Sequence, residues 1–203
     1  MRADQARRTR RQVVEAALVL FADRGFGSTT ISAIAEAAGV SRKTIFDSVG
    51  GKVQLVKLGY DFAITGDDEA IPLAEREVIS QLMAEPDPHR MVAGFAELVT
   101  TINGRIATVY RVLEGAAEDD PEARELFETL QDQRRSSMEC PMLRLSGTDS
   151  LRPGLSAARA ADLLWLYTDP TLYGQLVHRC GWSVDEFRDW LAATFQEQLL
   201  RSS

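Results

Sequence analysis

The sequence predicts an all-α protein, and three observations support this. Apolar residues recur at i, i+3, i+4 spacing in one segment after another, and capping residues and glycines bracket these segments. No alternating strand pattern and no internal repeat is found. The chain has 203 residues, of which 45% are apolar, enough for one large domain or for one small and one medium domain.

Four helices are expected in the first 65 residues, spanning about 6–24, 31–38, 42–48 and 52–65. The first carries an apolar stripe that includes Val13, Ala17 and Phe21. Thr30 and Ser41 are placed as N-caps of the two short helices that follow. Glycines at 25, 39 and 50–51 stop or separate the four segments.

The second half begins after an acidic connector at 66–73 and also predicts helices throughout. A short helix is expected at 74–84, and another starts at Pro88, with Gly104 as a candidate bend or break. The next starts at Pro121 and ends before Pro141, and residues 146–155 form a loop. A long helix over 156–179 should kink at Pro170. A capping box of Ser183 and Glu186 opens the last helix, which runs to about Leu200.

The net charge of −7 is unevenly distributed. Residues 1–52 carry nine basic and five acidic groups, a net +4, and the remainder carries 14 basic and 25 acidic groups, a net −11. A basic head concentrates the attraction for phosphate at one end of the chain. Charge alone does not distinguish this from a solvated helix face.

Residues 31–50 contain the spacing of a helix-turn-helix motif. Ala35 lets two helices cross closely, Gly39 forms the turn between them, and Ile45 anchors the second helix. The rest of this small core is expected from Ile31, Ile34, Ala38 and Val40. Any helical hairpin can show alanine and glycine at some spacing, but caps, core positions and a basic exposed face agree here within one short window. The motif predicts a sequence-specific DNA-binding protein whose second helix enters the major groove.

With these residues in place, residues 6–65 resemble the DNA-binding domain of TetR-type repressors. The segments that carry the resemblance are RRQVVEAALVLFADRGF, STTISAIAEAAGVSRKTIF and GGKVQL. The later stretch AADLLWLYTDPTLYGQLVHRCGWSVDEFRDWL is similar to C-terminal regions of some members. The resemblance implies a homodimer, with a helix-turn-helix domain at 6–65 and a helical ligand-binding and dimerisation domain at 66–203. It also implies a repressor that a small organic ligand releases from a palindromic operator. A cytoplasmic protein is expected because the first residues, MRADQARRTRRQ, do not form a signal peptide.

The resemblance assigns roles to individual residues. Arg42 and Lys43 are expected to contact bases, while Thr44, Lys52 and the start of the preceding helix meet phosphate. The expected DNA-contacting set is Thr29, Thr30, Ser41, Arg42, Lys43, Thr44, Phe46 and Lys52. The arginines at 7, 8, 10 and 11 supply an arm or a helix face to the duplex.

Four residues depart from the family pattern. The family usually has Tyr at Phe46, Tyr or His at Ser48, and Phe at Val49, so a hydroxyl contact to phosphate is lost at Phe46. Asp47 brings a negative charge close to DNA, which repels phosphate unless it faces a cytosine amino group.

The second half yields two residue sets, each with an alternative. A mostly apolar effector pocket is expected from Phe95, Tyr110, Leu113, Met138, Trp165 and Thr168, and tight core packing explains the same residues equally well. The last two helices, 156–179 and 183–200, are expected to pack with their mates as a four-helix bundle, and the dimer face on the final helix is expected from Phe187, Trp190, Leu191 and Phe195. The alternative is that this stripe covers its own domain.

Other classes of protein find little support. No catalytic signature surrounds His89 or His178, and neither histidine forms a common zinc pattern with Cys140 or Cys180, so we expect no enzyme, no metal and no cofactor. No run of about 18 apolar residues suggests a membrane span. The competing hypothesis is a helical scaffold, or a redox- or metal-responsive protein, with weak or no DNA binding.

Overall fold

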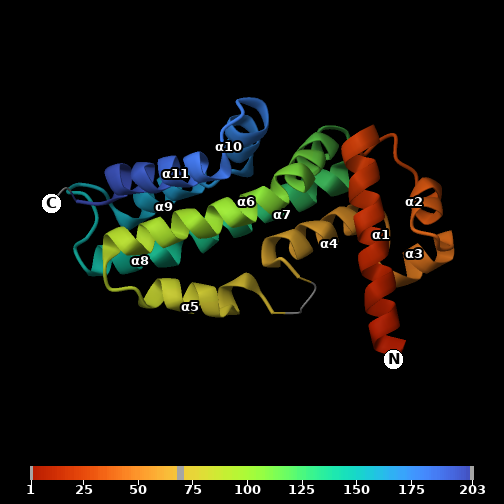
Figure 1. Cartoon of the computed structure of the whole chain (residues 1–203), viewed down its shortest axis with the longest axis horizontal. Coiled ribbons are helices and arrows are strands. Elements are labelled where there is room, and N and C mark those ends of the chain that lie inside the picture. The colour runs from red at the N-terminus through yellow and green to blue at the C-terminus, as the bar shows by residue number, and fades with distance from the viewer. Residues whose placement is uncertain (1, 68–70, 202–203) are drawn as a thin grey trace. The chain divides into compact units, whose positions relative to one another are not determined.

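The computed structural model describes residues 2–67 and 71–201, with side chains from Gln5 on. In this part of the chain the regular structure is helical, with one isolated bridge between Leu151 and Leu200 (Figure 1). Residues 68–70 of the expected connector lie outside the described residues. The all-α prediction is confirmed.

The chain divides into two compact units, Met1–Glu69 with Thr108–Thr129, and Ala70–Ala107 with Leu130–Ser203. The sequence-based division at 65/66 leaves residues 108–129 in the second half, whereas packing groups them with the N-terminal helices. Each unit is described by itself below.

The first unit opens with four helices: α1 (Arg2–Arg24), α2 (Ile31–Ala37), α3 (Arg42–Ser48) and α4 (Lys52–Thr65). Their positions match the prediction, except that α1 begins at Arg2 rather than near Ala6. The apolar stripe of α1 is buried, with Val13, Ala17 and Phe21 each at most 1% exposed. This stripe gives α2, α3 and α4 a common surface to pack on.

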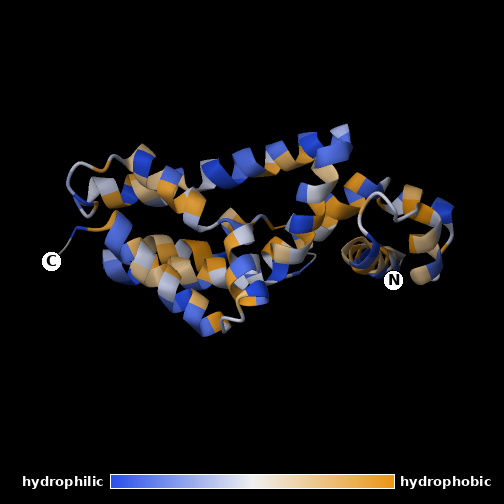
Figure 2. Ribbon diagram, turned by 90° about the horizontal axis from the view of Figure 1, so that it is seen from above, coloured by the Kyte–Doolittle hydropathy of each residue, from blue (hydrophilic) through white to orange (hydrophobic). Residues whose placement is uncertain are grey.

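The remaining helices follow in the order η1 (Leu73–Glu75), α5 (Glu77–Ala84), α6 (Pro88–Asp119), α7 (Pro121–Ser137), α8 (Glu139–Gly147), α9 (Ala157–Tyr167), α10 (Pro170–Tyr173), the π-helical segment η2 (Gly174–Arg179) and α11 (Val184–Leu199). Polar and apolar residues alternate along these helices (Figure 2). Helix α8 was not expected from the sequence as a separate element.

Helix α6 runs unbroken through Gly104, so a break of the helix there is wrong. A Cβ added at Gly104 would lie 3.2 Å from the hydroxyl oxygen of Tyr173. The glycine therefore serves the close approach of the Tyr173 side chain to α6 rather than a helix stop.

The long helix expected over 156–179 is interrupted rather than kinked, because α9 ends at Tyr167 and α10 begins at Pro170. Pro170 has no backbone N–H, and Asp169 accepts a hydrogen bond from the Thr171 amide at 2.8 Å as the N-cap of α10. The interruption leaves backbone carbonyls of α9 for side chains of other helices. The chain then continues into the π-helical segment.

Helix α11 contributes one apolar face to the core of the second unit. Four α11 residues, Phe187, Leu191, Phe195 and Leu199, are fully buried. They belong to one cluster with residues of α6, α8 and α9, which include Met91, Phe95, Met142, Leu145 and Leu164. The capping box that begins α11 is present as predicted, with Glu186 accepting from the Ser183 amide at 2.7 Å.

Candidate DNA-recognition site

The turn between α2 and α3 forms as its sequence predicts. The Thr30 hydroxyl accepts from the Ala33 amide at 3.1 Å, and the Ser41 hydroxyl accepts from the Thr44 amide at 3.0 Å. Gly39 between them has φ +64°, a conformation that other residues rarely adopt. The local sequence thus fixes both helix starts and the angle of the chain between them.

The core beneath this motif holds α3 in place. Ile45 is fully buried, together with Ile34, Ala35 and Ala38 of α2 and its C-cap, whereas Ile31 and Val40 are only half-buried. A buried Ile45 leaves the opposite face of α3 free to meet another molecule. This is the arrangement that a recognition helix requires.

Two polar side chains of α1 hold the ends of the motif, a role that the sequence did not predict. Gln12 Nε2 donates to the Ala38 carbonyl at 2.9 Å, at the end of α2. Arg10 Nε donates to the Ser48 carbonyl at 3.2 Å, at the end of α3. Arg10 was expected only as part of a DNA-contacting arm or helix face. No local pattern signals such a bond, because its two partners are 38 residues apart in the sequence.

The outer face of α3 carries charge and one large apolar side chain. Arg42, Lys43, Phe46 and Asp47 are exposed, and Lys43 pairs with Asp47 at 2.8 Å. The pair places a cation beside the Asp47 carboxylate, which was expected to repel phosphate. A surface pair of this kind contributes little to stability. The pair leaves Lys43 and Asp47 together without net charge on the exposed face of α3.

Thr29 is not placed to offer its hydroxyl to phosphate. The residue is 1% exposed, and its hydroxyl donates to the carbonyls of Gly25 at 2.8 Å and Leu20 at 3.2 Å. It closes the turn after α1 instead. Its exposed neighbour Thr30 remains in position at the start of α2.

Lys52 and Thr44 also have partners within the chain. Lys52 Nζ donates to the Phe26 carbonyl at 2.7 Å and lies 4.2 Å from the centroid of the Phe26 ring. It thereby ties the start of α4 to the turn after α1. The Thr44 hydroxyl lies 2.8 Å from that of Ser41.

The expected effector residues fall into both units. Tyr110 and Leu113 belong to the first unit, and Phe95, Met138, Trp165 and Thr168 belong to the second. All are buried except Trp165, which is half-buried.

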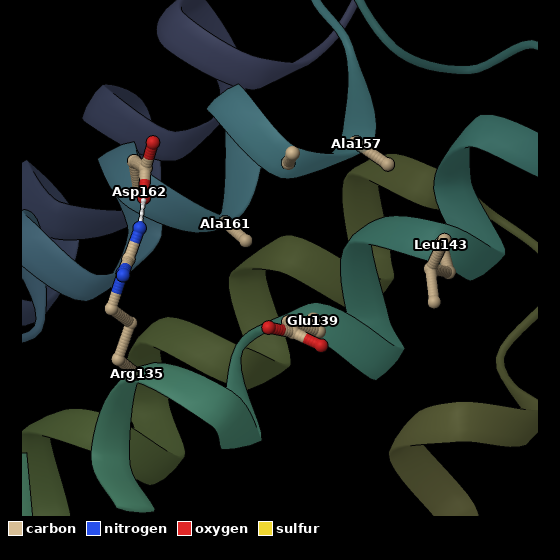
Figure 3. A pocket seen from close by; sticks show the side chains of 7 residues that line it. Arg135, Glu139, Leu143, Ala157, Ala161 and Asp162 are labelled. Carbon is tan, nitrogen blue, oxygen red and sulfur yellow. Dashed lines mark hydrogen bonds and ion pairs between the residues drawn. The ribbon is translucent and has the colours of Figure 1, made fainter. Parts of the chain in front are cut away.

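Two surface hollows lie elsewhere. One, of about 280 Å³, is lined by Arg135, Glu139, Leu143, Ala157, Ala158, Ala161 and Asp162 (Figure 3). A hydrogen bond to Asp162 raises the pKa of the Arg135 guanidinium there. The other hollow, of about 610 Å³, is in the first unit and is lined by Phe21, Ala22, Gly25, Phe26, Gly27, Lys52, Arg111, Val112, Gly115, Ala116, Asp119 and Asp120. None of the expected effector residues lines either hollow.

A polar cluster in the second unit was not foreseen as a whole. Arg134 donates to the Trp165 carbonyl, pairs with Asp169 at 2.9 Å, and lies 5.0 Å from the Trp165 ring centroid. Asn103 Nδ2 donates to the Thr168 carbonyl at 3.2 Å. Among the described side chains, Trp165 Nε1 is the buried polar atom that has no hydrogen-bond partner. An unpaired buried N–H is unusual and calls for an acceptor.

The expected dimer face needs correction. Phe187, Leu191 and Phe195 are each 0% exposed within the chain's own core, and only Trp190 is half-buried. The alternative that the stripe covers its own domain therefore accounts for these three residues. An intramolecular core requires the same helical stripe as a dimer face, so the sequence could not separate the two.

Cys140, Cys180, His89 and His178 are exposed. The described residues contain no group of three or more His, Cys, Asp or Glu side chains arranged to hold a metal ion. In the same residues, no helix has the length and apolar character needed to cross a membrane.

The capped, glycine-linked helix pair with its exposed basic face is a helix-turn-helix motif, the class of element that many DNA-binding proteins use. Residues 13–58 match the family model described as bacterial regulatory proteins, tetR family. The chain is 29% identical over 179 residues to the HTH-type transcriptional regulator TtgR of Pseudomonas putida. The match covers 82% of this chain and 79% of TtgR.

Solved structures share the fold over nearly the whole chain. NalD of Pseudomonas aeruginosa, the secondary repressor of the MexAB-OprM multidrug efflux pump, matches with a TM-score of 0.71 at 20% identity and covers 97% of this chain and 100% of NalD. A transcriptional regulator of Saccharomonospora viridis, in complex with choline, matches with a TM-score of 0.70 at 19% identity over 95% of this chain and 98% of its own. Residues 13–58 are thus similar to the tetR family model, and the chain as a whole is similar in sequence and fold to transcriptional regulators of this kind.

Proposed function

We propose that the chain is a homodimeric repressor that binds a palindromic operator and is released by a small organic molecule. The observation that carries this proposal is the exposed face of α3, where Arg42 and Lys43 begin a helix anchored from behind by Ile45. Two copies of one recognition helix require two equivalent half-sites, about 34–36 Å or a multiple apart. A protein with this function acts in the cytoplasm, with its operator DNA.

Binding to DNA fragments selected from a random pool tests the first part. Arg42→Ala should weaken binding to the selected operator about 5- to 140-fold per half-site, because a bidentate Arg–guanine pair contributes about 1–3 kcal/mol. Arg152→Ala is the matched control, since Arg152 is also exposed but lies on a loop of the second unit. Wild-type protein that shifts no DNA at low salt would instead favour the scaffold hypothesis.

For the dimer, we propose the outward faces of α9 and α11. Leu166 of α9 is 53% exposed and Val184 of α11 is 49% exposed, whereas the inner stripe of α11 is buried in the protomer. Leu166→Glu should give folded monomers, because it places a charge in the interface without disturbing the core. A wild-type protein that sediments as a monomer at micromolar concentration contradicts the proposal.

For the effector, we propose a site that includes Trp165. Its buried indole N–H has no partner among the described residues, so a ligand with a hydrogen-bond acceptor would satisfy it. Choline bound to the Saccharomonospora relative supports a small-molecule site in this fold. A ligand can shift DNA affinity only by its differential affinity for the two states, typically about 1–3 kcal/mol.

Thermal melting in the presence of candidate ligands finds molecules that bind the folded state. A ligand found in this way should then release operator DNA. Trp165→Phe removes the N–H and keeps most of the ring, so it should weaken the ligand and leave DNA binding intact. A ligand whose affinity is the same for Trp165→Phe and wild type would exclude this site.

A further inference from the structure

The surface of α3 divides into distinct strips. At 3.6 residues per turn, Lys43 and Asp47 each lie about 160° around the helix from the buried Ile45. They form the outermost strip and are joined by the 2.8 Å ion pair. Arg42 and Phe46 lie roughly 60° and 100° from Ile45 on one side of the helix. The face of the helix that points away from Ile45 therefore carries the Lys43–Asp47 ion pair, and a strip formed by Arg42 and Phe46 lies beside it.

Phe46 is unusual in this position. It is 53% exposed, although the core residue next to it in the sequence, Ile45, is 0% exposed. Its ring has no hydrogen-bonding group, so it cannot donate to a phosphate as the hydroxyl of a tyrosine can. Packing within the chain does not account for it. A ring left uncovered on a binding face is best explained by an apolar group on the partner.

The neighbouring charges indicate which partner covers the ring. Arg42 and Lys43 stand four and three residues before Phe46, on adjacent positions of the helix surface. A protein partner that buried the ring would also have to desolvate these cations. DNA instead attracts them, and its major groove presents one apolar group among the base edges, the 5-methyl of thymine.

We propose that Phe46 contacts the 5-methyl group of a thymine in each half-site and so specifies thymine at that position. This inference rests on the proposed DNA-binding function and adds a specificity determinant to it. Arg42 on the same strip would read the neighbouring base pair. Lys43, paired with Asp47, would limit the repulsion that the carboxylate exerts on the phosphates.

Replacing thymine by deoxyuridine tests the contact, because it removes only the methyl group. The probe is the operator selected from a random pool. One thymine position is replaced at a time, and the replacement is made at the equivalent position of both half-sites. One symmetric pair of replacements should weaken wild-type binding by about fourfold per half-site, the effect of burying one methyl-sized group, or roughly 15-fold for the dimer.

Phe46→Ala should bind the thymine and deoxyuridine operators equally at that position and keep the wild-type response at every other thymine. Val19→Ala is the matched control, since Val19 is an exposed apolar residue of α1, 68% exposed, and should retain the wild-type profile. Because Phe46 is exposed, circular dichroism and melting should show the variant folded.

Each outcome bears on a different claim. The thymine contact is overturned if no deoxyuridine replacement in the operator weakens wild-type binding. It is also overturned if wild type and Phe46→Ala respond in the same way to the replacement of every thymine. If that operator is still weakened by Arg42→Ala, the proposed DNA-binding function stands. Absence of any selected operator overturns both.

Discussion

Leu191→Ala should destabilise the second unit and leave the oligomeric state unchanged. Leu191 is 0% exposed in a cluster that also contains Phe187 and Phe195 from the same helix. Truncation of a fully buried leucine removes its apolar contacts and leaves a cavity, at a cost of about 2–5 kcal/mol. For a chain of this size, that corresponds to a decrease of roughly 4–20 °C in the melting midpoint.

The assay combines denaturant titration with sedimentation of the same samples. Leu143→Ala is the matched control, because it is the same truncation in the same unit at a side chain that is 62% exposed. The control should stay within about 0.5 kcal/mol of wild type. Leu191→Glu should fail to fold the second unit rather than give folded monomers, since it buries an unpaired charge.

A folded Leu191→Ala monomer with an unchanged midpoint, from a dimeric wild type, would refute this placement of the stripe. That result would mean that the apolar face of α11 is buried against a second copy. It would also restore the dimer face that periodicity alone suggests.

Three further predictions concern single interactions. Gly39→Ala should lower the unfolding free energy by about 1–2 kcal/mol, because the φ angle of Gly39 is +64°. Gly27→Ala should lower it by less, since Gly27 does not have a positive φ, and equal melting midpoints of the two variants would contradict this. Arg134→Met should cost about 3–5 kcal/mol in denaturant titration, since it leaves a mostly buried carboxylate without its cation. Hydrogen bonds from Ser183 lower the pKa of Glu186, so their stabilisation is full above the ordinary glutamate pKa and is lost as pH falls through the lowered value. Glu186→Gln should therefore lower the melting midpoint at neutral pH and match wild type in acid, and a pH-independent difference would exclude this origin.

The helix-turn-helix was predictable because its signals are local. Each N-cap bond joins residues three apart, Thr30 to Ala33 and Ser41 to Thr44, and Gly39 specifies its own backbone angle. Such interactions depend on neighbours along the chain, so the sequence by itself determined the motif, its helix bounds and its exposed basic face.

Tertiary structure decided which polar side chains already have hydrogen-bond partners within the chain. The Thr29 hydroxyl and the Lys52 ammonium bond carbonyls of the turn after α1, and Arg10 bonds the end of α3. These contacts join residues up to 38 apart, and no spacing rule identifies them. A residue type that suits phosphate binding also suits a backbone carbonyl, so composition cannot choose between the two.

The same limit applies to the second unit. The sequence determined that α11 has a buried face, because periodicity reports burial, but only the packing of α6, α8 and α9 decided that the chain itself covers it. Likewise, Pro170 indicated a disturbed helix from the sequence alone. The complete interruption is stabilised by Arg134 and Asn103, which lie 31 and 65 residues from the carbonyls that they bind. A helix can end inside a core only where donors from elsewhere meet its freed carbonyls, and the three-dimensional arrangement alone supplies them.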